Sequence, residues 1–132
     1  MDSGQAEAQL LTLLNQDRAA AGVPPLTLNA ALSAVARTHS CDMFLHQQLN
    51  HTGSDGSSPF QRMAAGGFPM PPYSQEGENI GQAAGVMPSN AVSLINNEMM
   101  AEPLSYGTHH WNIVNSSYKI VGLGIVVANG QT

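Results

Sequence analysis

Charged side chains are scarce in this chain of 132 residues, where they make up 10 % of the sequence, against ~25 % in typical soluble domains. Only four are basic, and Arg18, Arg37, Arg62 and Lys119 are spread along the sequence. They cannot form the continuous cationic stripe that binds a phosphate backbone or an anionic membrane surface. With nine acidic residues the formal charge is −5, and we expect no nucleic-acid partner.

Cysteine and long apolar runs are also lacking. Cys41 is the only cysteine, which excludes an internal disulfide and a zinc site built from several thiolates. We expect its side chain to be a small, buried apolar group. No segment approaches the roughly 18 consecutive apolar residues of a membrane-spanning helix. Residues 1–9 are polar and contain two acids, so they do not predict a signal peptide.

Apolar residues nevertheless make up 42 % of the chain. This is enough for one globular domain with a core, in a chain too short for two ordinary domains. Helical spacing of these residues predicts helices over about 5–21, 30–48, 60–64 and 90–101. Asn29 and the Ser58-Pro59 pair are the expected N-terminal caps of the second and third helices.

The strand signals are fewer. The β-branched, apolar run over residues 119–128 is the strongest, and residues 77–81 form a shorter one. Asn129-Gly130 is a typical hairpin turn, and residues 103–110 are expected to form a loop. No repeat or linker divides these elements, so we expect a single domain over residues 1–132.

Histidine is the unexpected excess, because the five histidines outnumber lysine and arginine together. His39 and His46 lie seven residues apart, on the apolar face of the second predicted helix. We expect His39 to be partly buried and hydrogen-bonded, and we assign no function to His46.

Five segments, taken in order, resemble the motifs of one family. They are residues 14–29 (LNQDR to LTLN), Asn50–Phe60 (NHTGSDGSSPF), Gly77–Ile80 (GENI), Gly107–Val114 (GTHHWNIV) and Tyr118–Ile125 (YKIVGLGI). Together they resemble the CAP superfamily of cysteine-rich secretory, antigen-five and pathogenesis-related proteins, in its cysteine-poor bacterial branch. The resemblance covers residues 7 to 128, nearly the whole chain.

The resemblance implies a fold and a location. The fold is α+β, a three-layer α-β-α sandwich with a small, mainly antiparallel sheet. The family's closing strand, which follows an Asn-Gly turn, is not found after Asn129-Gly130. An open sheet edge of this kind favours pairing with another chain, including dimerisation. Because members of the family are secreted, the resemblance also implies an extracellular protein whose leader has been removed.

The resemblance also implies a cleft, lined by two histidines and two acids, that binds a divalent metal ion, most simply zinc. By motif, the histidines are His51 and His109 and the first acid is Glu78. The second acid is Glu98 by its place on the helix, or Glu102 by the pattern around the following proline. Of the two we prefer Glu98.

The chemistry of these residues agrees with such a site. Imidazole nitrogens and carboxylate oxygens suit zinc and other first-row divalent ions. However, His51 and His109 are 58 residues apart, so their meeting depends on the fold. The structural alternatives are that His51 only hydrogen-bonds its own loop and that Glu78 only forms a salt bridge. His110 follows His109 directly and projects in another direction, so we expect it to lie outside the cleft.

Three functions remain open. The first is a secreted module that binds a metal ion or small ligand and interacts with a cell-envelope component, a lipid or another extracellular ligand. The second is a weak, protease-like hydrolase that depends on a metal or on a His/Glu pair. Its candidate groups are His51, Glu78 and His109 with Ser54, Ser57 or Ser58. No nucleophile elbow or oxyanion donor is recognisable, so we rank this function lower. The third is a structural or adhesive domain with a vestigial cleft.

Overall fold

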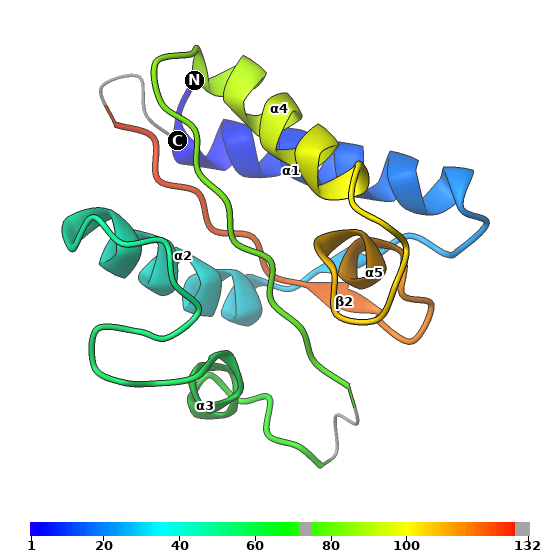
Figure 1. Cartoon of the computed structure of the whole chain (residues 1–132). Helices are drawn as coiled ribbons and strands as arrows, with labels where there is room; N and C mark the ends of the chain where they lie inside the picture. The colour runs from blue at the N-terminus through cyan, green and yellow to red at the C-terminus, as the bar shows by residue number, and fades with distance from the viewer. Residues whose placement is uncertain (72–74, 129–132) are drawn as a thin grey trace.

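The computed structural model describes residues 1–71 and 75–128. In chain order, its elements are α1 (Ser3–Ala20), β1 (Thr27–Leu28), α2 (Ala30–Leu45), α3 (Pro59–Ala65), α4 (Pro88–Met100), α5 (His109–Val114) and β2 (Ile120–Val121) (Figure 1). The four predicted helices are confirmed. The six-residue helix α5 was not predicted, because it is too short to show a periodic pattern.

The helices begin where the sequence places capping residues. Asn29 accepts a hydrogen bond from the backbone N–H of Leu32 at the start of α2. Ser58 and Gln61 form a reciprocal capping box at α3, with proline in its first turn. α2 ends at Leu45, earlier than predicted, and Gln47 follows with a φ of 50°, which cannot continue a right-handed helix.

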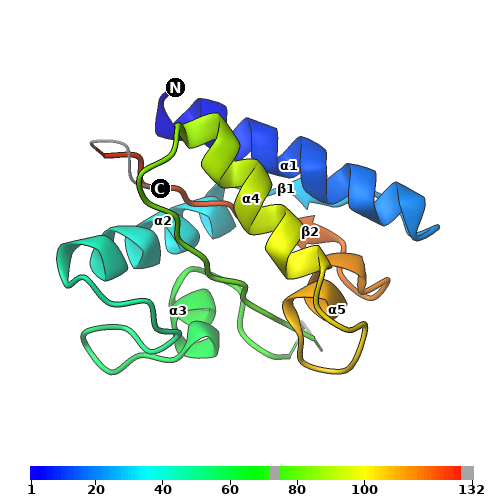
Figure 2. The same cartoon turned by 45° about the horizontal axis from the view of Figure 1, so that its top comes forward.

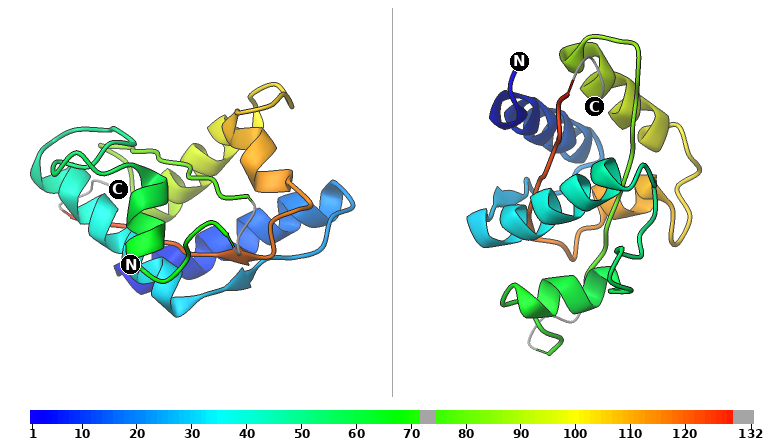
Figure 3. Two further views of the ribbon diagram at one scale, coloured as in Figure 1. Left: turned by 90° about the horizontal axis from the view of Figure 1, so that it is seen from below. Right: turned by 90° about the vertical axis from the view of Figure 1, so that its left-hand side faces the viewer.

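The helices enclose the extended segments from two sides. α1 packs against α4 and α5, and α2 contacts α3. Figures 2 and 3 show α1 and α4 on one side of the molecule and α2 and α3 on the other, with the extended chain between them. This arrangement gives the expected α-β-α layers.

The sheet departs from the prediction in direction. β1 and β2 pair in parallel, with Thr27 opposite Ile120 and Leu28 opposite Val121. The prediction of a mainly antiparallel sheet is therefore wrong for the two strands of the described residues, which are parallel. The reason is the connectivity: β1 leads into α2, and β2 leads into a segment that lies along α2, so both strands run the same way.

The sheet is also smaller than predicted. Of residues 119–128, Ile120–Val121 form β2 and Ala128 forms an isolated bridge, whereas backbone groups between them bond to side chains. The N–H of Leu123 donates to Ser33 Oγ at 3.1 Å, and that of Ile125 donates to Glu7 Oε2 at 3.0 Å. Residues 77–81 form no strand within the described chain. The predicted Asn129-Gly130 turn lies outside the described residues.

The core joins α1, α5 and the segment after β2. Leu14, Ile113 and Leu123 form its buried centre. Beside it lies the fully buried Arg18. The Arg18 guanidinium donates to the carbonyls of Pro24, Ile113, Asn115 and Tyr118. These bonds fix the end of α5, and with it the start of β2, against α1. None of the helices in the described residues is both long and apolar enough to cross a membrane.

Candidate functional site

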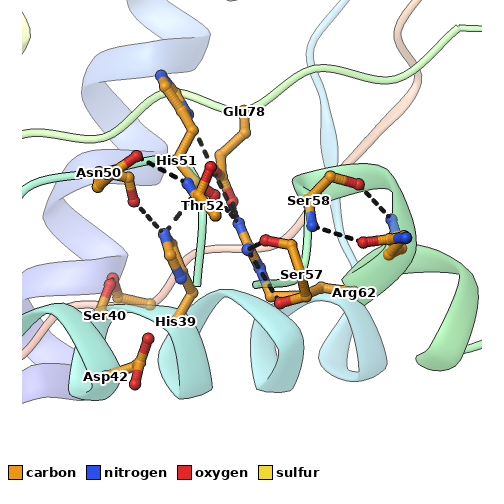
Figure 4. A network of polar contacts seen from close by, with 12 residues as sticks. His39, Ser40, Asp42, Asn50, His51, Thr52, Ser57, Ser58, Arg62 and Glu78 are labelled. Carbon is orange, nitrogen blue, oxygen red and sulfur yellow. Dashed lines mark hydrogen bonds and ion pairs between the residues drawn. The ribbon is translucent and has the colours of Figure 1, made fainter. Parts of the chain in front are cut away.

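His51 and Glu78 meet at the surface between the loop before α3 and the segment before α4. His51 Nδ1 lies 2.9 Å from Glu78 Oε1. The histidine side chain is half exposed, whereas the glutamate is 18 % exposed. Figure 4 shows the two side chains pointing toward one another above α2. The two residues that the motifs singled out therefore place an imidazole and a carboxylate in direct contact.

Arg62 holds this pair in place from α3. Its Nη2 donates to both Glu78 oxygens, at 3.1 and 2.9 Å, and to the His51 carbonyl at 2.9 Å. Its Nη1 donates to the Ser57 carbonyl at 2.9 Å. In the sequence, Arg62 stands out only as one of four scattered basic residues. Its position in the helix that directly follows the His51 loop was the available signal.

His39 lies beneath the pair, as Figure 4 shows. It is 3 % exposed, which confirms the expectation of a buried histidine. Its Nε2 lies 2.8 Å from the Asn50 carbonyl and 4.0 Å from Glu78 Oε1. Because a carbonyl can only accept, Nε2 is the N–H donor and Nδ1 is an acceptor. That Nδ1 is buried and has no hydrogen-bond partner among the described residues.

A second histidine–carboxylate pair forms at the start of α5. His109 Nδ1 lies 2.7 Å from Glu102 Oε2, and the His109 backbone N–H donates to Glu102 Oε1 at 2.8 Å. The hydrogen bond from the His109 side chain, followed by that from its backbone, lowers the pKa of Glu102. The adjacent His110 instead donates from Nδ1 to the Glu102 carbonyl at 2.9 Å.

Of the two acids that the motifs offered, Glu102 is the one that contacts His109, and the preferred Glu98 does not. Glu98 is exposed on α4 and makes no hydrogen bond or ion pair with a described residue. It lies two residues after the buried Asn96, so it is turned about 200° away from that buried position on the helix. Glu102 follows the end of α4, where the chain bends back toward α5.

The Gly77–Ile80 segment connects the two pairs. Glu78 contacts His51, and the next residue, Asn79, donates from Nδ2 to the His109 carbonyl at 3.2 Å. Asn112 on α5 donates to Asn79 Oδ1 at 2.8 Å. Two adjacent residues of this motif therefore contact His51 and His109, which are far apart in the sequence.

Both contacts leave the same histidine atom available. In each pair Nδ1 faces a carboxylate and is the N–H donor, so Nε2 carries the free lone pair. Carboxylates that fix histidine in this way are typical of metal-binding imidazoles. No three His, Cys, Asp or Glu side chains of the described residues are grouped to hold a metal ion. The described residues therefore form two separate histidine–carboxylate pairs and no three-ligand metal site.

The serines near His51 have other partners. Ser54 donates to Asp42, and this side-chain hydrogen bond lowers the pKa of Asp42. Ser58 caps α3, and the Ser57 hydroxyl lies 3.4 Å from Arg62 Nη1. No hydrogen bond joins a serine to a histidine side chain in the described part of the chain. The serine nucleophile that the hydrolase hypothesis needs is therefore not activated here.

Cys41 on α2 and His46, which caps the end of that helix, lie outside the site. His46 bonds from Nδ1 to the Asp42 carbonyl one turn earlier at 2.9 Å. Cys41 is exposed, so the expectation that it is buried was wrong. It lies two residues after the buried His39, a rotation of about 200° that places it on the outer face of the helix.

Comparisons with known proteins place this geometry in context. A profile of the cysteine-rich secretory protein family (CAP) matches residues 11–132. The chain is 28 % identical over 120 residues to the uncharacterized protein YkwD of Bacillus subtilis (strain 168), covering 91 % of this chain and 42 % of that protein. It therefore spans less than half the length of this relative.

Solved structures share the fold. An outer surface protein from Borrelia burgdorferi gives a TM-score of 0.67 at 17 % identity, over 92 % of this chain and 81 % of that one. An extracellular protein containing an SCP domain from Bacillus anthracis str. Ames gives 0.64 at 21 % identity, over 98 % of this chain and 39 % of that one. A cysteine-rich secretory protein from Staphylococcus aureus gives 0.57 at 16 % identity, over 98 % and 37 %.

Proposed function

This chain belongs to the cysteine-rich secretory protein (CAP) family, and from that premise we propose that it is a secreted binding domain whose two histidine–carboxylate pairs hold a divalent metal ion. Its bacterial structural relatives include an extracellular SCP-domain protein. The observation that carries the proposal is that His51 and His109 make the same type of hydrogen bond to a carboxylate. Each donates from Nδ1 to a carboxylate and keeps Nε2 free.

In this proposal some residues bind the metal ion and others hold the ligands in position. His51 and His109 supply the Nε2 lone pairs, while Glu78 and Glu102 hold the imidazoles in the required tautomer. Arg62 fixes the Glu78 carboxylate with two hydrogen bonds. A zinc ion held by two imidazoles keeps open positions that can bind water or a ligand group and polarise it.

We favour binding over catalysis, because no nucleophile paired with a base is found among the described residues. The open positions of the metal ion suit an anionic or carbonyl-bearing group of an extracellular partner, such as a cell-envelope component or a lipid headgroup. The alternative of a structural domain with a vestigial cleft predicts that zinc has no effect on the protein.

Isothermal titration calorimetry with zinc chloride tests the metal site. We expect saturable binding at pH 7.5 and a higher melting temperature in the presence of zinc. The double substitution His51→Ala and His109→Ala abolishes both effects. Binding weakens below about pH 6, because a protonated imidazole cannot bind a metal ion.

His46→Ala is the matched control, because His46 is exposed at the C-terminal end of α2 and contacts neither pair. This variant keeps the zinc affinity of the parent protein. Zinc binding that disappears equally in His46→Ala, or survives the double substitution unchanged, contradicts the assignment of the ligands.

A further inference from the structure

An exposed aromatic surface lies on the connection between α4 and α5. Tyr106 is 89 % exposed, more than any other large apolar side chain of the described residues, and Leu104 in the same loop is 61 % exposed. The Tyr106 ring packs against the Trp111 indole on α5, with 5.7 Å between the ring centroids and 55° between the ring planes. Figure 3 shows this connection projecting from the molecule beyond the end of α4. Neighbouring exposed apolar groups of this kind mark contact surfaces.

The backbone of this connection is held in a fixed turn. The Thr108 hydroxyl lies 2.9 Å from the Pro103 carbonyl and 3.0 Å from the Ser105 carbonyl. The N–H groups of Ser105 and Thr108 also donate to these two carbonyls. Gly107 has a φ of 89°, which residues with a side chain rarely adopt. The Tyr106 ring is therefore positioned in advance, which reduces the entropy lost when it binds a ligand.

A small pocket adjoins the aromatic pair. Its volume is about 190 Å³, room for about six waters, which suits one ring-sized group. Leu104, Trp111 and Val114 supply its apolar lining, and Asn115 and Ser116 supply polar side chains. None of the described residues that line it is charged. All five lie on α5 or in the loops beside it, so the pocket does not depend on how the sheet is completed.

The lining has hydrogen-bonding groups available for a ligand. The Trp111 indole N–H and the Ser116 hydroxyl make no hydrogen bond with another residue in the described part of the chain. Asn115 Nδ2 donates to Gln75 Oε1 at 3.3 Å and has a second hydrogen. The surface therefore combines aromatic rings with uncharged donors and acceptors.

This combination favours the pyranose ring of a saccharide. Such a ring has a face of C–H groups that packs on an aromatic side chain, and hydroxyl groups at its edge that bond to amide and hydroxyl side chains. An acyl chain or a leucine side chain would fill the same space but leave the Trp111 N–H and the Ser116 hydroxyl unpaired. An anionic ligand would find no cation among the described residues of the lining.

We propose that Trp111 and Tyr106 bind two neighbouring uncharged sugar rings of a glycan, one in the pocket beside Trp111 and the next against Tyr106. The distance between the two aromatic centroids is similar to the spacing of adjacent rings in a glycan chain. Trp111 lies two residues after His109, a rotation of about 200° on α5. The sugar site therefore uses neither histidine–carboxylate pair and needs no zinc.

Titration of the 132-residue protein with cellotriose and with triacetylchitotriose, in the absence of zinc, tests the proposal. These probes share their ring and linkage and differ in one substituent on each ring. Trp111 is the only tryptophan, so its fluorescence reports this surface directly. We expect a saturable change in emission with at least one of the two probes.

Substitutions at Tyr106 locate the binding. Tyr106→Ala removes one of the two rings and weakens the affinity by about tenfold, as truncation of a central aromatic contact does. Tyr106→Phe keeps the ring and most of the affinity. Phe60→Ala is the matched control, because Phe60 is an exposed aromatic residue on α3 and does not line the pocket. Circular dichroism checks that all three variants fold, as expected for exposed positions.

Three results would overturn the proposal. The absence of any emission change or calorimetric heat with both probes shows that no sugar binds. Equal affinities for Tyr106→Ala and the parent protein show that this aromatic pair is not the site. Binding of phosphatidylcholine vesicles without binding of either saccharide identifies the surface as a membrane contact.

Discussion

The two histidine–carboxylate pairs differ in how tightly each carboxylate is held. Glu78 is 18 % exposed and shared between His51 and the Arg62 guanidinium. Glu102 is more exposed and is held by the side chain and the backbone N–H of His109. Both hydrogen bonds to Glu102 therefore come from His109, so substitution of this one histidine tests what lowers the pKa of Glu102.

We expect the Glu102 carboxyl to titrate below the ordinary range of glutamate. Its pKa is lowered first by the hydrogen bond from the His109 side chain and then by the backbone N–H of His109. His109→Ala removes the larger cause, so the pKa of Glu102 moves up toward its usual value. Carbon-13 NMR of the side-chain carboxyl follows this titration directly.

His110→Ala is the control for the Glu102 titration. His110 bonds to the backbone carbonyl of Glu102 and is the smallest of the causes that lower its pKa. The Glu102 titration therefore changes little in this variant. An equal upward movement in both variants would show that His109 has no special contact with the carboxylate.

The motifs pointed to residues that form histidine–carboxylate pairs in the structure, but not to the contacts themselves. His51 and Glu78 meet as the resemblance implied, and His109 pairs with an acid. Spacing along a helix does not say which face is buried, so the sequence could not show that Glu102, and not Glu98, contacts His109. Arg62 was missed because the Glu78 carboxylate that it holds lies 16 residues further along the chain, in a segment that approaches α3 only after folding.

At the scale of elements, the segment after β2 lies directly on the backbone of α2. A Cβ built on Gly122 would lie 2.2 Å from the carbonyl carbon of Leu32, and one on Gly124 would lie 2.1 Å from the backbone nitrogen of Arg37. Only residues without a side chain allow this approach. The Gly-x-Gly pattern thus sets the distance between the α2 layer and the extended chain.

Gly122→Ala is expected to destabilise the protein by about 3 kcal/mol, because a backbone atom cannot move aside as a side chain can. Urea unfolding measures the change. Gly4→Ala is the control, since its Cβ meets only an ordinary contact with Asp2 in the first turn of α1. That variant is neutral or more stable by up to about 1 kcal/mol. Similar losses in both variants would contradict the close packing on α2.

The helices were predictable and the sheet was not, for a physical reason. Helix signals are local, since the apolar period and the caps at Asn29 and Ser58 lie within each segment. The strand signal over residues 119–128 correctly indicated extended chain. Its length was wrong because the partners of that chain are the Glu7 and Ser33 side chains, which no strand pattern contains.

At the scale of the whole molecule, the carboxylates have opposite effects on stability. Hydrogen bonds from Ser54, Ser57 and His109 lower the pKa values of Asp42, Asp55 and Glu102. Their contribution is fully present above the unfolded pKa of about 4 and is lost as the pH falls through the folded values. Burial instead raises the pKa of Glu76.

Glu76 therefore destabilises the protein at neutral pH. A carboxyl with a raised folded pKa costs no stability below its unfolded pKa, 4.5. Stability is lost as the pH rises from that value through the folded pKa, because the buried Oε2 must then carry charge without a partner among the described residues. Glu76→Gln removes the charge, so we expect a higher urea midpoint than the parent protein at pH 7 and a smaller difference at pH 4.

Glu98→Gln separates this effect from a simple change in net charge. Glu98 is exposed on α4 and has no partner in the described part of the chain, so its substitution changes the midpoint little at either pH. A gain in Glu98→Gln as large as in Glu76→Gln would mean that the net charge of −5, and not burial, limits stability. A gain confined to Glu76→Gln and to neutral pH identifies the unpaired Glu76 carboxylate as the cause.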